Sequence, residues 1–256
     1  MNEPINVDVT DFVAVVTLNR PPVNAQNIEL RDLLVKTFDE LSDRDDVRAV
    51  ILTGAGKAFS AGADLKDRGG LDTVLGEYWR HSRRIREGFN AIRECTKPVI
   101  AAVNGVALGA GFVVAASCDI IIASEDAKFG MPEIDVGLAG GAFMLNSLFG
   151  KSIGRQLFFT GDRVPAAELY RLGAISAVVP ADQLMAKARE IADKIASKSP
   201  IGVVTAKQSY NTIESMSPRD AYRFEQNVTH ALSQTDDAKE AKLAFLEKRK
   251  PVFTGK

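Results

Sequence analysis

The sequence predicts an α/β fold for residues 1–196, followed by a helical region in residues 197–256. Two observations predict the α/β part. Short, fully apolar runs alternate with longer segments of helical periodicity, and each apolar run has the length of a strand. This alternation is typical of a mostly parallel sheet with crossover helices. The third observation is that helix patterns follow one another in the C-terminal part.

The predicted elements of the first part follow in chain order. Residues 12–18 form a strand, and the apolar positions of residues 30–41 mark one face of a helix. Residues 49–52 and 99–103 are continuous apolar runs, which are expected for strands buried on both faces. A charged helix is predicted for residues 72–94.

The remaining elements are a small-residue helix, one more strand and the later helices. The helix begins near Gly109, and residues 120–122 form the strand. Residues 184–195 carry apolar side chains at helical spacing. Ser217, followed by a proline, is expected to cap the next helix, and a last helix is predicted for residues 236–250.

Composition limits the possible partners. The chain has 256 residues, is 46% apolar and carries a net charge of −1. No global basic field would draw it to nucleic acid or to an anionic membrane, so we expect neither partner. No apolar run approaches the ~20 residues of a membrane span, and no N-terminal signal pattern is visible. We therefore expect a cytoplasmic protein, or an organellar one from which a transit peptide has been removed.

The cysteines and histidines are predicted to be structural. Cys95 and Cys118 form no CxxC pair and are expected to be reduced and buried. His81 lies among the arginines of a charged helix, and His230 lies in a C-terminal helix. Neither has a context that suits a zinc ligand or a Ser-His-Asp triad, so we expect no metal site.

Three segments rich in small residues stand out: residues 56–66, 104–111 and 129–134. Glycine and alanine at the end of a buried strand let a ligand approach the backbone, and a helix start presents free N–H groups. Two such donors from two loops could form an oxyanion hole. Each segment alone is also consistent with a tight strand-to-helix turn. The glycines of residues 54–57 lack the spacing of a P-loop, and those of residues 109–111 lack the third glycine of a dinucleotide fingerprint.

Taken together, these segments resemble the enoyl-CoA hydratase/isomerase family, also called the crotonase family. The matching stretches, in this order, are NRP (19–21), SAGADL (60–65), KPVIAAVNG (97–105), CDI (118–120), FG (129–130), PE (132–133) and AFLEKR (244–249). The resemblance covers nearly the whole chain. The joint match is highly specific and favours a ligand site over turns alone.

The resemblance implies a crotonase-like α/β spiral of ββα units with a C-terminal helical trimerisation region, and homotrimers that often pair into hexamers. It also implies that the backbone N–H groups of Ala63 and Ala110 form an oxyanion hole. Family members usually have glycine at the second of these positions. Alanine keeps the N–H group, but we expect its methyl group to narrow the site.

The resemblance also places residues that bind coenzyme A. Ala61 lies where the family backbone contacts adenine, and Lys66 lies near the phosphates. Phe245 and Lys248 match C-terminal positions that reach the coenzyme A of a neighbouring subunit. For the two lysines, ordinary solvated charge is the alternative. No separate cofactor is expected, because coenzyme A is part of an acyl-CoA substrate.

Glu133 falls where the family places a catalytic carboxylate. It follows Pro132 in an apolar stretch, so we expect partial desolvation to raise its pKa toward the range useful for proton transfer. The alternative is a surface glutamate in a turn. Family hydratases usually carry a second glutamate at the position of Val113, and valine cannot hold or activate water.

The resulting hypothesis is an enzyme that hydrates an enoyl-CoA or shifts its double bond through an oxyanion-stabilised thioester enolate. Two alternatives remain open at this point. One is a family hydrolase or decarboxylase on a cyclic or branched acyl-CoA, and the other is a non-catalytic, RNA-binding relative. Residues 69–80 and 137–148, in which Gly140 replaces a common proline, are expected to shape the acyl pocket.

Overall fold

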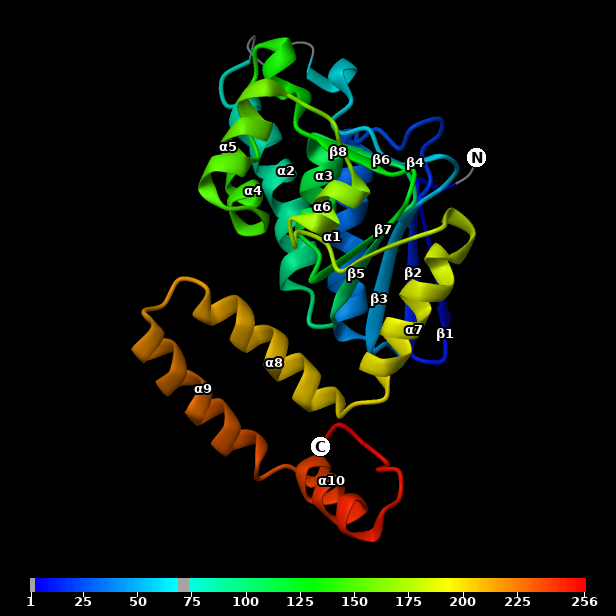
Figure 1. The fold of residues 1–256 in the computed structure, drawn as a ribbon, viewed down its shortest axis with the longest axis vertical. Coiled ribbons are helices and arrows are strands. Elements are labelled where there is room, and N and C mark those ends of the chain that lie inside the picture. Colours follow the sequence, from blue (N-terminus) through cyan, green and yellow to red (C-terminus); the bar gives the residue numbers. More distant parts are fainter. Residues whose placement is uncertain (1–2, 69–73) are drawn as a thin grey trace.

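The computed structural model describes residues 3–68 and 74–256, and its main element is a six-stranded sheet (Figure 1). The strand order is β1 (Ile5–Thr10), β2 (Val13–Leu18), β3 (Ala49–Gly54), β5 (Val99–Val103), β7 (Ile120–Ser124) and β10 (Ala177–Val179). The strands from β2 to β10 pair in parallel, which confirms the mostly parallel sheet. β1 pairs antiparallel with β2 at the edge. It was missed because most of its side chains are exposed and give no apolar run.

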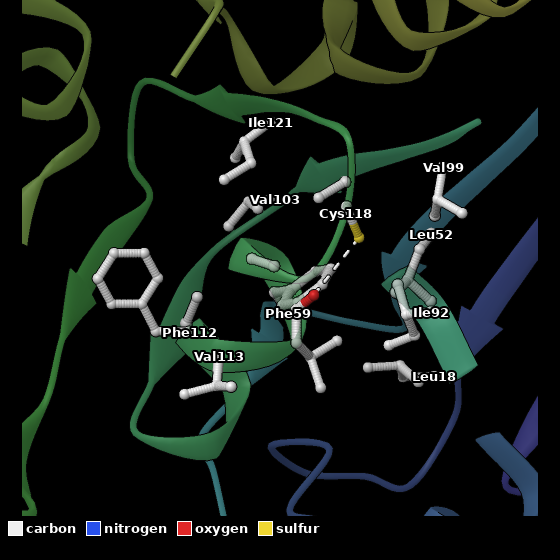
Figure 2. Close-up of a cluster of buried hydrophobic side chains, with 14 of the residues drawn as sticks. Leu18, Leu52, Phe59, Ile92, Val99, Val103, Phe112, Val113, Cys118 and Ile121 are labelled. Carbon is white, nitrogen blue, oxygen red and sulfur yellow. Dashed lines mark hydrogen bonds between the residues drawn. The ribbon is translucent and has the colours of Figure 1, made fainter. Parts of the chain in front are cut away.

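Helices cover both faces of this sheet. On one face, α1 (Ile28–Asp43) and α2 (Glu77–Glu94) pack over the larger apolar core, part of which Figure 2 shows. On the other face, α7 (Leu184–Ala196) covers a second core. Successive residues of β3 alternate between the two cores, because side chains of a strand point to opposite faces. This explains why the central strands are apolar throughout.

A second sheet of four short strands was not predicted. It consists of β4 (Ala58–Ser60), β6 (Val106–Leu108), β8 (Lys128–Gly130) and β9 (Val164–Pro165). β4, β6 and β8 pair in parallel, and β9 is antiparallel to β8. Strands of two or three residues are too short to show a periodic pattern. The carboxyl ends of β4, β6 and β8 consequently meet at one edge.

Shorter helices connect these sheets. They are α3 (Ala110–Ala116), α4 (Ala142–Leu148), α5 (Lys151–Thr160) and α6 (Ala166–Arg171), with 3₁₀ turns η1 (Leu65–Arg68), η2 (Pro132–Val136) and η3 (Ala181–Gln183). Cys95 and Cys118 are buried free thiols, as predicted. Burial raises the pKa of the Cys118 thiol well above its ordinary value, which keeps it protonated.

The C-terminal helices α8 (Pro200–Ile213), α9 (Pro218–Leu232) and α10 (Asp236–Glu247) extend away from the sheets (Figure 1). α8 is tied to the core by buried Lys207, whose Nζ donates to Asp119 Oδ2 at 2.7 Å. The predicted cap is confirmed, since Ser217 Oγ accepts from Asp220 N. α10 ends three residues before the predicted 250, because Lys248 adopts a left-handed φ of 55°. Within residues 3–68 and 74–256, no helix is long and apolar enough to cross a membrane.

Candidate active site

The three small-residue segments singled out in the sequence lie side by side. Each contains all or most of one of the parallel strands β4, β6 and β8 and continues past its carboxyl end, so all three leave the same edge of the small sheet. The carboxyl ends of parallel strands are a common location for ligand sites in α/β proteins. The segments converge although they are far apart in sequence.

Ala63 presents a backbone N–H group that no described residue accepts. Its neighbours are bonded to a parallel segment: Gln26 N donates to Gly62 O at 2.8 Å, and Asp64 N donates to Gln26 O at 3.0 Å. Ala63 forms an isolated parallel bridge with Gln26. In this register the N–H group of Ala63 points away from Gln26. It is therefore free to bind a ligand.

Ala110 carries a second backbone N–H group for which the described residues provide no acceptor, because it is the first residue of α3. The first N–H groups of a helix have no acceptor within the helix. The two loops are in close contact: a Cβ atom built on Gly62 would lie 2.6 Å from Leu108 O and 3.3 Å from Ala110 N. Only glycine allows this approach, and it brings the residues that follow Gly62 and Gly109 together.

Glu133 places its carboxylate against the second loop. A Cβ atom built on Gly109 would lie 2.4 Å from Glu133 Oε1. Glu133 is half-buried in η2, which begins at Pro132, and its Oε2 atom is shielded from solvent. The carboxylate therefore lies against Gly109, the residue that directly precedes Ala110 in the chain. A proton acceptor beside two N–H donors is suited to the formation of an enolate.

Val113 occupies an apolar environment on the same short helix as Ala110. It is buried beside Phe112 in the core that Figure 2 shows. A Cβ atom built on Gly141 would lie 2.7 Å from Met131 Cε and 2.9 Å from Val113 Cγ2. The position where family hydratases carry a second glutamate is thus filled by hydrocarbon.

The predicted coenzyme A residues fall into two groups. Ala61 and Lys66 flank Ala63 in the loop and turn after β4; Ala61 N donates to Val23 O, while Lys66 is exposed. Phe245 is 82% exposed on α10, and Lys248 is exposed where α10 ends. Within one chain, α10 lies at the opposite end from β4, β6 and β8 (Figure 1). Two segments, 69–80 and 137–148, were expected to shape the acyl pocket, and residues 69–73 of the first lie outside the described residues.

Sequence reasoning missed the residues that hold the first loop in place. They are Arg20, Asn24 and Asp64. The Arg20 backbone N–H donates to Asn24 Oδ1, and the Arg20 guanidinium donates to Asp64 Oδ2. Asn24 is fully buried, and its Nδ2 donates to the carbonyls of Ala58 and Phe59 in β4. The NRP turn was a signal for this network, but the sequence alone did not say what the turn contacts.

Comparisons with known proteins show what the chain as a whole is similar to. Residues 8–256 match the family model described as enoyl-CoA hydratase/isomerase. A short-chain-enoyl-CoA hydratase of Clostridium acetobutylicum is 41% identical over 93% of this chain and 92% of its own. A mitochondrial enoyl-CoA hydratase of Pongo abelii is 37% identical over 94% and 83%. The solved structure of an enoyl-CoA hydratase from Bacillus anthracis superposes with a TM-score of 0.93 at 36% identity, covering 99% of this chain and 100% of that one.

Proposed function

Because the chain belongs to the enoyl-CoA hydratase/isomerase family, we propose that it converts an enoyl-CoA through a thioester enolate, with Glu133 as its acid and base. The observation that carries this proposal is the convergence of Ala63 N–H, Ala110 N–H and the Glu133 carboxylate on one edge of the small sheet.

In the proposed mechanism, the two N–H groups hold the thioester oxygen. Glu133 removes a proton from Cα, and the electron pair of that C–H bond delocalises onto the oxygen, where the two donors stabilise the negative charge. The same carboxyl group then returns the proton to Cγ, which shifts the double bond. Hydration passes through a different thioester enolate, which the same two donors would stabilise. It forms when water adds to Cβ and loses a proton to Glu133, and the carboxyl group then delivers a proton to Cα.

The environment of Val113 favours reactions that need one carboxylate. A double-bond shift needs only one, since a single group can carry the proton between two carbons. Hydration also remains a candidate, because relatives at 37–41% identity are named enoyl-CoA hydratases. With valine in place of the water-orienting glutamate, we propose that hydration is confined to an enoyl-CoA whose own substituent activates it.

A side-by-side assay tests this division. The native protein is expected to convert a 3-enoyl-CoA to its 2-enoyl isomer faster than it hydrates crotonyl-CoA. The hydrated product is measured by its added mass, and the isomer, which has the mass of its substrate, is measured by the ultraviolet absorbance of the newly conjugated double bond. Val113→Glu tests the missing group, and Val113→Leu is the matched apolar control. The new carboxylate either raises crotonyl-CoA hydration or destabilises the fold through unpaired burial. Efficient crotonyl-CoA hydration by the native protein would contradict the single-carboxylate mechanism.

We propose further that the chain assembles as a trimer or a dimer of trimers, in which α10 completes the coenzyme A site of a neighbour. The exposure of Phe245 and the distance of α10 from the small sheet support this arrangement. Light scattering at micromolar concentration should give the mass of three or six chains. Mixing Glu133→Gln with Lys248→Met subunits should restore turnover, since some mixed sites keep both native residues. A fully active monomer would disprove the shared site.

A further inference from the structure

We propose that Arg20 is a positioning residue that fixes the direction of the Ala63 N–H group. It does so by clamping the segment that carries Ala63 to the parallel segment that carries Gln26. The inference rests on the proposed function, because it assigns Arg20 a role in holding the thioester oxygen. Arg20 itself contacts no group that we place at the reacting atoms.

The geometry of the Arg20 side chain shows the clamp. Arg20 Nη2 donates to Asp64 Oδ2 at 2.8 Å, and Nη1 donates to Ala25 O at 2.9 Å. Asp64 follows Ala63, and Ala25 precedes Gln26, the residue that forms the bridge with Ala63. One planar guanidinium therefore joins both strands of the bridge. A lysine ammonium, which is a point charge, cannot reproduce this fork.

The clamp acts on a segment that is already anchored at its other end. Asn24 Nδ2 donates to Ala58 O at 2.8 Å, and Ser60 Oγ donates to Asn24 O at 2.8 Å. These bonds fix residues 23–24 against β4. Beyond Gly62, which is in a left-handed conformation with φ of 98°, the loop is held by the bridge, by Arg20 at the residue after Ala63 and, further along, by Asp67, whose Oδ2 accepts from Ile28 N at 2.7 Å. Loss of Arg20 would therefore loosen the part of the loop that carries Ala63.

The clamp is charged under the conditions in which the enzyme would work. Hydrogen bonds from the Lys66 N–H group and from the Arg20 guanidinium lower the pKa of the Asp64 carboxyl below its usual range. Asp64 is therefore ionised at any pH above the pKa of an ordinary aspartate. Its side chain is 15% exposed, so water screens the pair only in part.

The test is the variant Arg20→Gln, with Arg44→Gln as its control. Arg44, like Arg20, makes two side-chain hydrogen bonds, but both go to the carboxylate of Asp46, at 2.7 and 2.6 Å, on an exposed surface before β3. Arg20→Gln should lower kcat about 10- to 100-fold with little change in KM, because a donor moved by about 1 Å stabilises the oxyanion poorly. The kcat of Arg20→Lys should fall between those of the native protein and Arg20→Gln, and the kcat of Arg44→Gln should match that of the native protein.

A spectroscopic readout separates positioning from stability. Acetoacetyl-CoA forms an enolate that absorbs in the near ultraviolet, and the intensity of that band on the protein reports stabilisation of the thioester oxyanion. Arg20→Gln should weaken the band at saturating ligand. Full kcat and a full band, with only a lower melting temperature, would overturn the positioning role. A native protein that binds acetoacetyl-CoA without any enolate band would instead contradict the proposed function itself.

Discussion

Glu133→Gln is expected to lower kcat by about 10²–10⁴-fold, the usual contribution of a positioned general acid or base. The amide keeps the size and much of the hydrogen bonding of the carboxylate, but it cannot take up a proton. The Glu133 carboxylate rests against Gly109, next to the Ala110 donor. Val113, which replaces the second glutamate, offers no group to share the work.

The control for this variant is Asp135→Asn, which removes a carboxylate from the same 3₁₀ turn. Asp135 is exposed, and its Oδ1 atom would lie 3.1 Å from a Cβ atom built on Gly161, on the side of α5. Its loss should leave kcat nearly unchanged. Binding of coenzyme A should be close to native in both variants, because neither residue is placed against the nucleotide.

Exchange of the Cα protons of a saturated acyl-CoA in D₂O isolates the proton-transfer step. Native protein should catalyse this exchange, and Glu133→Gln should not. If Glu133→Gln exchanged protons at the native rate, another group would be the base and the role of Glu133 would have to be abandoned.

The sequence predicted the four inner strands of the large sheet, from β2 to β7, and the helices α1, α2 and α7 that cover it, because their signals repeat over several residues. The apolar runs of β3 and β5 reflect burial between two cores, and the face of α1 shows clear helical periodicity. The small sheet was missed for a physical reason. β4, β6 and β8 are held in place by pairing with one another, which is a tertiary contact that no local pattern records.

The candidate site was predictable residue by residue only through family resemblance. Glycines at 62 and 109 indicated close backbone approach, but only the structure shows that Gly62 approaches Ala110 and that Gly109 approaches Glu133. The Arg20 clamp joins positions far apart in the chain, so charge alone could not reveal it. The roles of Ala63, Ala110 and Glu133 stay predictions.

Ala110→Pro is expected to lower kcat by about 10²–10³-fold, the typical loss when one oxyanion donor is removed. Proline has no N–H group, and it is well tolerated at the first position of a helix. Ala110 is that position in α3, and the structure shows no described acceptor for its N–H group. The substitution therefore deletes the donor. Gly109, which would precede the proline, lies at φ of 52° and ψ of −125°, outside the extended region preferred before proline, so circular dichroism must accompany the assay.

Two control variants separate loss of the donor from disturbance of the backbone. Ala110→Gly keeps the N–H group and removes only the methyl group, so its activity should remain near native. Lys151→Pro places proline at the first position of α5, where Gly150 is already extended at ψ of 152° and the side chain is exposed. It should fold and work normally. If Ala110→Pro retained a native circular dichroism spectrum and near-native turnover, the N–H group of Ala110 would have no part in the mechanism, and the thioester oxygen would have to be held by Ala63 with a donor other than Ala110.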